Sequence, residues 1–205
     1  FRRVLFRSPH DEQRRVYNQV WVDLDDARWV FLNTLFSHSE ACLYAQLVDR
    51  LDQGALPRGL DYQRLYELVI DAMNTAHLEG ALKAEIIADP ERFVDLDPQL
   101  PQTLLDLKHA GKKLFLATNS EWHYTRAMMA FAFGPWLDGP DRESQWRSLF
   151  DLVIVQAKKP AFFEQRQPFL EVVDDTSAVP LQGPLQAGRV YKGGNAEAVQ
   201  EHFGL

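Results

Sequence analysis

The sequence has a single cysteine, Cys42, among its 205 residues. One thiol excludes an internal disulfide and a CxxC metal knuckle, and we expect Cys42 to be a small buried apolar residue on a helix. Long apolar runs are also missing, because no window approaches the roughly 20 uninterrupted apolar residues of a membrane span. The apolar run within residues 1–8 is too short and too rich in arginine for a signal peptide. The sequence therefore predicts a cytoplasmic protein with no membrane partner.

The sequence has fewer positively charged residues than negatively charged ones. The chain has 22 Lys and Arg against 29 Asp and Glu, a formal net charge of −7. A polyanion is repelled by such a surface on average, which argues against nucleic acid as a partner. Any phosphate that the protein handles must lie in a locally positive pocket, so the composition favours a small ligand. Internal repeats and low-complexity linkers are also missing, and 46% hydrophobic residues are enough for a sizeable core.

The first eight residues, FRRVLFRS, differ from the chain that follows. Back-translated with the codons TTC AGA CGT GTG CTC TTC CGA TCT, this octet resembles read-through of a common sequencing-library adapter. We therefore expect residues 1–8 to pack against nothing and to have no role, and we expect the gene to be cut at its 5′ end. A genuine short basic arm is the alternative.

Helical periodicity dominates the first half of the chain. Ser37 and Glu40 have the spacing of a capping box, and the apolar positions that follow share one helical face as far as Gly54. Asp61 is a suitable cap for a second helix, which closes near Gly80. Three further helices are expected over residues 82–87, from about Pro101 to a C-terminal cap at Gly111, and from a cap at Asn195 to His202.

Two wholly apolar segments predict buried parallel strands, Leu114–Ala117 and Phe150–Val155. A helical pattern lies between them, so the three elements form a βαβ unit, and open parallel sheets bind ligands beyond the carboxyl ends of their strands. Polar clusters follow both strands, at residues 118–120 and 158–159. The later segment GPLQAGRVYKGG predicts turns and a short hairpin.

The chemistry of these clusters suits a phosphate. Thr118 offers a hydroxyl, and the backbone N–H groups of Asn119 and Ser120 at a helix start form a natural anion seat. A lysine from the neighbouring strand end would supply full charge, and Lys159 is better fixed than the lysine before it because Pro160 restricts the preceding backbone. From the residues alone, a mere helix cap and a solvated lysine pair remain the alternatives.

Several blocks of the sequence closely resemble the cytosolic purine 5′-nucleotidases, the IMP/GMP-preferring branch of the haloacid dehalogenase-like phosphatases. The blocks are FLATNSEWHYT, FDLVIVQAKKPAFF and GPLQAGRVYKGGN, with FLNTLFSHSEACLYAQLVD and AHLEGALKAEI before them. The resemblance implies an α/β protein with a haloacid dehalogenase-like, Rossmann-type core and a mainly helical cap. We therefore expect a cap segment over residues 9–78 and an incomplete core over residues 79–205.

The resemblance also implies a mechanism. A nucleophilic aspartate in a DxDxT motif forms an aspartyl-phosphate, and Mg²⁺ is held by that motif and a later GDxxxxD motif. The sequence matches the family at Thr118 of the phosphate-binding motif, with Asn119 following it, and at Lys159, the motif lysine before proline. We expect Thr118 and Lys159 to be catalytic and Asn119 and Ser120 to bind substrate.

A purine nucleoside monophosphate is the partner that the resemblance implies. Phe36 matches the aromatic that stacks on the purine, while His77 and Lys83 match positions that contact base and phosphate respectively. Leu78 stands where a well-studied branch has an aromatic residue and Asn74 where it has an acid, so the base preference, IMP or GMP, stays open. The resemblance also leaves open whether the protein forms a homo-oligomer.

The segment DLDDA, which begins at Asp23, looks like a nucleophile motif, but Ala27 falls where its hydroxyl residue should be. We therefore interpret DLDDA as an acidic entry to the cap, and no GDxxxxD motif precedes the last residue. These observations predict a 5′-nucleotidase truncated at both ends, inactive by itself, with its nucleophile and its Mg²⁺ ligands outside the chain. Another small-metabolite phosphatase of the same superfamily and a non-catalytic nucleotide-binding or assembly module are the alternatives.

Overall fold

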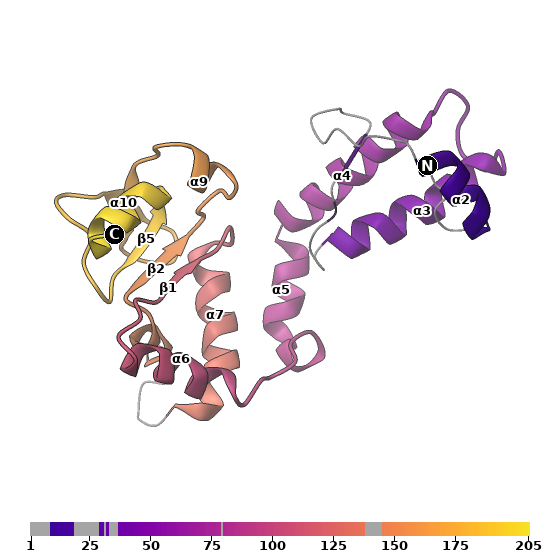
Figure 1. The fold of residues 1–205 in the computed structure, drawn as a ribbon. Helices are drawn as coiled ribbons and strands as arrows, with labels where there is room; N and C mark the ends of the chain where they lie inside the picture. Colours follow the sequence, from indigo (N-terminus) through magenta and orange to yellow (C-terminus); the bar gives the residue numbers. More distant parts are fainter. Residues whose placement is uncertain (1–8, 19–28, 31, 33–36, 79, 138–144) are drawn as a thin grey trace. The chain divides into compact units, whose positions relative to one another are not determined.

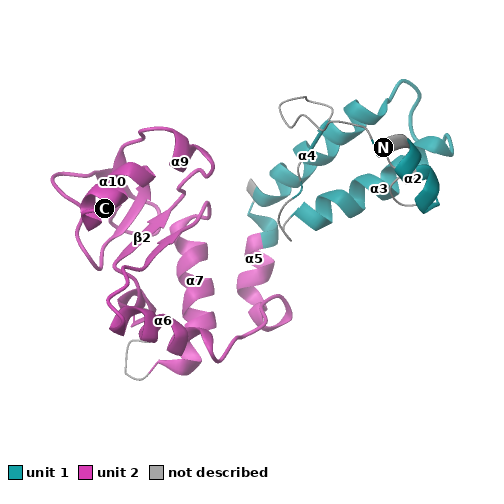
Figure 2. Ribbon diagram, in the orientation of Figure 1, with its two compact units in different colours: residues 1–82 teal, residues 83–205 magenta. Residues whose placement is uncertain are grey.

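The structure is a computed structural model that describes most of the chain. The described residues are 9–18, 29–30, 32, 37–78, 80–137 and 145–205. They divide into two compact units, residues 1–82 and residues 83–205 (Figure 2). Residues 1–8 lie outside the described part, so the adapter hypothesis stays a prediction.

The first unit is helical. Its helices are α2 (His10–Tyr17), α3 (His38–Asp52) and α4 (Tyr62–Leu78). Helices α3 and α4 pack on each other, and their buried apolar side chains are Val48, Leu65 and Val69. Helix α4 begins as the sequence predicts, because an Asp61 carboxylate oxygen accepts a hydrogen bond of 2.7 Å from the Arg64 N–H.

Helix α3 corrects two expectations. Ser37 stands at its N-cap, but no side-chain capping bond forms there. Glu40 instead accepts a hydrogen bond from the Tyr66 hydroxyl of α4, so its carboxylate joins the two helices rather than completing a capping box. Burial first, and then this bond to Glu40, raise the pKa of Tyr66. Cys42 is exposed on α3 rather than buried.

The second unit contains a five-stranded sheet and the remaining helices. The strands are β1 (Phe115–Ala117), β2 (Leu152–Val155), β3 (Phe169–Val172), β4 (Ala178–Pro180) and β5 (Val190–Gly193). The α-helices are α5 (Ala81–Ala88), α6 (Leu100–His109), α7 (Trp122–Phe133), α9 (Ala161–Glu164) and α10 (Ala196–Phe203). Short 3₁₀ segments are η2 (Pro90–Arg92), η3 (Gly134–Trp136) and η4 (Trp146–Leu149).

The sheet has the order β1-β2-β5-β3-β4. Strands β1, β2 and β5 are parallel, which confirms the predicted βαβ unit of β1, α7 and β2. The hairpin expected near residues 183–194 is wrong, because β5 enters the sheet beside β2 and pairs antiparallel with β3. The hairpin is formed by β3 and β4 instead. The molecule is therefore mixed α/β, a sheet-containing core accompanied by a helical segment, as predicted.

Alternating residues of β2 face two separate hydrophobic clusters. Leu152 and Ile154 pack with Phe162, Tyr191 and other residues of α9, β5 and α10. Val153 and Val155 pack on the opposite face with a cluster drawn from α7, η4 and α6. In Figure 1, α6 and α7 lie on one side of the sheet and α10 lies on the other. Burial on both faces explains why this strand reads as an unbroken apolar run.

Candidate functional site

The candidate site begins where β1 and β2 end. The two strands are paired through Ala117 and Ile154, and three backbone bonds continue this pairing into the loops. The Thr118 N–H donates to the Ile154 carbonyl, the Ala157 N–H to the Thr118 carbonyl, and the Gln156 N–H to the Ser120 carbonyl. The polar clusters that the sequence placed after each strand are thus held against each other, at the edge where parallel sheets bind ligands.

The Thr118 hydroxyl accepts one hydrogen bond within this turn and can donate another. Its Oγ1 accepts a bond of 3.1 Å from the Ser120 N–H, and the hydroxyl keeps its own hydrogen for another acceptor. Helix α7 starts at Trp122 with Glu121 at its N-cap, so Asn119 and Ser120 precede the helix. Of the two backbone N–H groups expected to form an anion seat, that of Ser120 is already bonded to Thr118.

Asn119 forms a clamp on the backbone of Lys159. Its Oδ1 accepts from the Lys159 N–H at 2.7 Å and its Nδ2 donates to the Lys159 carbonyl at 3.1 Å. The Lys159 ammonium donates to the Ala117 carbonyl at 2.8 Å, so it lies across the end of β1 although it follows β2. The side-chain amide of Asn119 thus holds the backbone of Lys159, and a role of Asn119 in substrate binding stays a prediction.

The neighbouring Lys158 is arranged differently. Its backbone is left-handed, with φ of 57°, and its side chain is exposed. Within the described part of the chain its ammonium makes no hydrogen bond or ion pair, whereas Lys159 is fixed by its backbone and by its ammonium. The peptide bond between Lys159 and Pro160 is cis. The geometry thus favours Lys159 over Lys158 as the lysine of the site.

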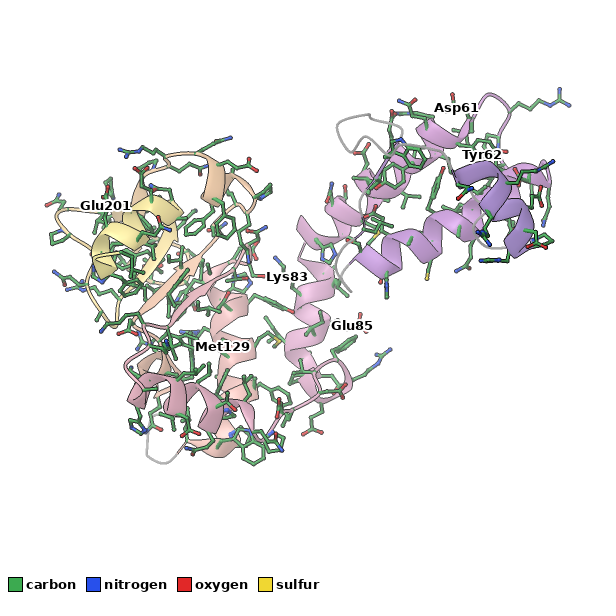
Figure 3. The ribbon with its side chains drawn as sticks, viewed as in Figure 1. Asp61, Tyr62, Lys83, Glu85, Met129 and Glu201 are labelled. Carbon is green, nitrogen blue, oxygen red and sulfur yellow. The ribbon has the colours of Figure 1, made fainter. Side chains whose placement is uncertain are left out.

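Lys83 reaches the same turn from α5. Its ammonium forms an ion pair and hydrogen bond with Glu121, the residue after Ser120, and lies 5.5 Å from the centre of the Tyr124 ring. In Figure 3 the Lys83 side chain extends from α5 toward α7. The Lys83 side chain is only 15% exposed, so its charge stands in a partly desolvated position beside Glu121, where electrostatic interactions are stronger than in water.

Glu121 was not singled out from the sequence. Burial acts to raise the pKa of its carboxyl group, but hydrogen bonds from Lys83 and from its own backbone, together with the charge of Lys83, outweigh burial and leave the pKa lowered. Glu121 is therefore ionised at neutral pH and balances Lys83. An acidic residue at the N-cap of a predicted helix was the available signal.

The other residues that the sequence singled out belong to residues 1–82 of the chain. His77 lies in the last turn of α4, in the first unit. Phe36 and Asp23 lie outside the described residues. In the parts of the chain that the structure describes, no three His, Cys, Asp or Glu side chains are grouped so as to hold a metal ion. No helix among the described residues is long and apolar enough to cross a membrane.

Comparison with known proteins identifies the family. The sequence pattern of the 5′ nucleotidase family matches residues 6–205. The chain belongs to the 5′ nucleotidase family. A 5′-nucleotidase domain-containing protein of Dictyostelium discoideum is 31% identical to it over 166 residues, which are 80% of this chain. The chain spans 27% of the length of that curated relative. This member of the 5′ nucleotidase family thus holds five of the predicted site residues within its second unit: Thr118, Asn119, Ser120, Lys83 and Lys159.

Proposed function

We propose that the protein to which this chain belongs hydrolyses purine nucleoside 5′-monophosphates, IMP or GMP, to nucleoside and phosphate. The observation that carries the proposal is that the Lys159 ammonium donates to the carbonyl of Ala117, the residue before Thr118, at the carboxyl end of β1. Membership of the 5′ nucleotidase family supports the reaction class. We refer to Thr118, Lys159 and Lys83, with the Ser120 turn between them, as the phosphate cradle.

The cradle contributes charge and hydrogen bonds rather than a nucleophile. In the proposed reaction a carboxylate oxygen attacks phosphorus, the bond from phosphorus to the ester oxygen breaks, and the nucleoside leaves with a proton. Water then hydrolyses the aspartyl-phosphate. Lys159 offsets the negative charge that separates the carboxylate from the phosphate, and Thr118 donates a hydrogen bond to a phosphoryl oxygen. Lys83 adds a second positive charge once the phosphate competes with Glu121 for it.

Mg²⁺ is the metal that we propose for the whole protein, where it would offset charge on the transferring phosphoryl group. The described residues of this chain do not fit a Mg²⁺ site, because they contain no suitable group of three ligands. Glu121, the carboxylate beside the cradle, is already paired with Lys83. We therefore assign Mg²⁺ binding to residues outside the described part.

We assign recognition of the purine base to Phe36, which would stack on it, and to His77, which would make a polar contact with it. An aromatic ring is a suitable platform for any purine, so these residues would favour purine monophosphates over other phosphate esters without deciding between IMP and GMP. Steady-state kinetics of the whole protein with IMP, GMP and ribose 5-phosphate test this assignment. Equal kcat/KM for all three would contradict a purine site and favour a general small-metabolite phosphatase.

The cradle is tested in the whole protein with Lys159→Met, Thr118→Val and the matched control Lys158→Met. Because the lysine charge matters most as the phosphoryl group transfers, Lys159→Met should lower kcat by more than it raises KM. Thr118→Val removes one hydrogen bond to a charged group, so kcat/KM for IMP should fall about 10- to 100-fold. Lys158→Met should change little. If Lys158 proves essential and Lys159 dispensable, the assignment is wrong.

We propose further that the 205-residue chain alone does not turn over IMP. Glu121, the carboxylate beside the cradle, is bound to Lys83. An anion-binding seat without a nucleophile cannot form the covalent intermediate. A phosphate-release assay on the purified chain measures this. Turnover that Asp23→Asn abolishes would identify DLDDA as the nucleophile motif after all.

A further inference from the structure

A second pocket lies in the 83–205 unit, beside the start of β5. It has a volume of about 250 Å³ and is lined by residues of α7, η4, β3 and the turn before β5. Its polar lining residues are Trp122, Arg147, Glu171 and Arg189. The volume is that of roughly eight water molecules in the liquid, so the pocket suits a small metabolite rather than a whole nucleotide.

The pocket offers hydrogen-bond donors whose partners are missing. The half-buried Arg147 guanidinium and the Trp122 indole N–H make no hydrogen bond or ion pair within the described part of the chain. Arg189, in the turn before β5, forms an ion pair with Glu171 of the neighbouring strand β3. The two arginines and one glutamate leave a net positive lining, although the chain as a whole carries −7.

The backbone of the pocket adds no competing donor. The N–H groups of Gly188, Arg189 and Val173 are already bonded to the carbonyls of Asp151, Gln186 and Ser177. Recognition therefore depends on the side chains. A guanidinium fork matches the paired oxygens of a carboxylate or phosphate group, and an indole N–H can serve only as a donor. Both unpaired groups thus favour an oxygen acceptor, and the guanidinium favours one that carries negative charge.

We propose that this pocket binds a small oxyanion-bearing metabolite, a phosphate ester or a carboxylate, through Arg147 and Trp122. The site is distinct from the phosphate cradle. It opens at the amino-terminal end of β5, where Val190 pairs with Val153, whereas the cradle follows the carboxyl ends of β1 and β2. It therefore does not depend on the proposed nucleotidase reaction, and the two sites can be inactivated separately.

The test is an NMR titration of the 205-residue chain in a Lys159→Met background, which removes the ammonium of the cradle. Each of the five tryptophans gives one indole N–H signal, and the Trp122 signal is assigned by its loss in Trp122→Phe. Sodium phosphate and sodium malonate are titrated separately, with ionic strength held constant by sodium chloride. The Trp122 signal should shift in a saturable manner with at least one of them. Phosphate alone indicates a phosphate ester, malonate alone a carboxylate, and both a general oxyanion site.

Arg147→Gln should weaken this binding about tenfold or more, as expected for loss of a charge-assisted pair. The control is Arg58→Gln, which removes the same charge from an exposed position in the first unit and should bind as the parent does. Arg147→Lys keeps the charge without the guanidinium fork, so its affinity for the anion should lie between those of Arg147→Gln and Arg58→Gln. The proposal therefore remains testable if Arg147→Gln does not fold. No saturable Trp122 shift with either anion, or equal binding by the Arg147 and Arg58 variants, would overturn the proposal.

Discussion

The two units of the molecule are stabilised in different ways. The first unit packs α3 on α4, where Val48, Leu65 and Val69 are the buried apolar residues of the two helices. It adds polar links such as the bond from the Tyr66 hydroxyl to Glu40. The second unit buries both faces of a sheet, with separate apolar clusters on each. The phosphate cradle follows directly from strands β1 and β2 of that sheet, so its geometry depends on the packing of the second unit.

Core truncation gives the largest difference between the units. Ile154→Ala on β2 should lower the free energy of unfolding by about 4 kcal/mol, because neighbouring strands on both sides prevent the cavity from collapsing. Leu65→Ala on α4 removes a similar volume but should cost only about 2 kcal/mol, since two helices can shift together. Urea unfolding followed by far-UV circular dichroism and tryptophan fluorescence measures both losses. Equal losses would mean that the two units are packed alike.

Removal of an ion pair should give a smaller difference between the two units in the free energy of unfolding than core truncation does. The lowered pKa of Glu121 means that its pair with Lys83 stabilises the fold above the ordinary glutamate pKa, about 4.3, and that this stability is lost as the pH falls through the folded value. Glu121→Gln should therefore cost about 1 kcal/mol at pH 7, and the difference from the parent should shrink below pH 4. Urea unfolding at pH 7, 5 and 3.5 measures it.

Glu67→Gln is the matched control in the first unit. Its carboxylate pairs with Arg64 one turn away on α4, and both side chains are about half exposed. A hydrogen bond from Arg64 lowers the pKa of Glu67 as well, so the pH dependence has the same sign. Solvent screens this pair, and the loss should be smaller than for Glu121→Gln at every pH. A larger loss in the first unit would reverse the comparison.

Local sequence signals predicted much of this architecture. Asp61 caps α4 and Asn195 caps α10 as expected, each with a side-chain oxygen accepting a backbone N–H. The apolar runs predicted two buried parallel strands, and β2 is fully buried. The prediction of burial is wrong for β1, which lies at the edge of the sheet and leaves Phe115 41% exposed. These features depend on residues close together in the chain, where spacing alone carries the information. The placement of Thr118 and Lys159 at one sheet edge followed from the topology of a βαβ unit.

Contacts between distant residues were not predictable in the same way. The clamp of Asn119 on Lys159 joins residues 40 apart, and the Glu121–Lys83 pair joins residues 38 apart. Their side chains meet only because the register of β1 with β2 and the position of α5 bring them together. The position of β5 in the sheet was missed for the same reason, since GRVYKGG resembles a hairpin arm until a distant partner strand is known.

The smallest effect concerns Cys42, which the sequence placed in the core and the structure places on the surface of α3. The apolar stripe of this helix runs through Ala41, Tyr44, Leu47, Val48 and Leu51. Cys42 follows Ala41 directly, about 100° around the helix, so it turns away from that stripe. Cys42→Ser should therefore change the free energy of unfolding by less than about 0.5 kcal/mol. The folded chain should also react with one equivalent of Ellman's reagent at nearly the rate of the urea-unfolded chain, because it holds a single thiol. A reaction that is many times slower in the folded chain would show that the thiol is buried and would give the first unit a larger core than α3 and α4 display.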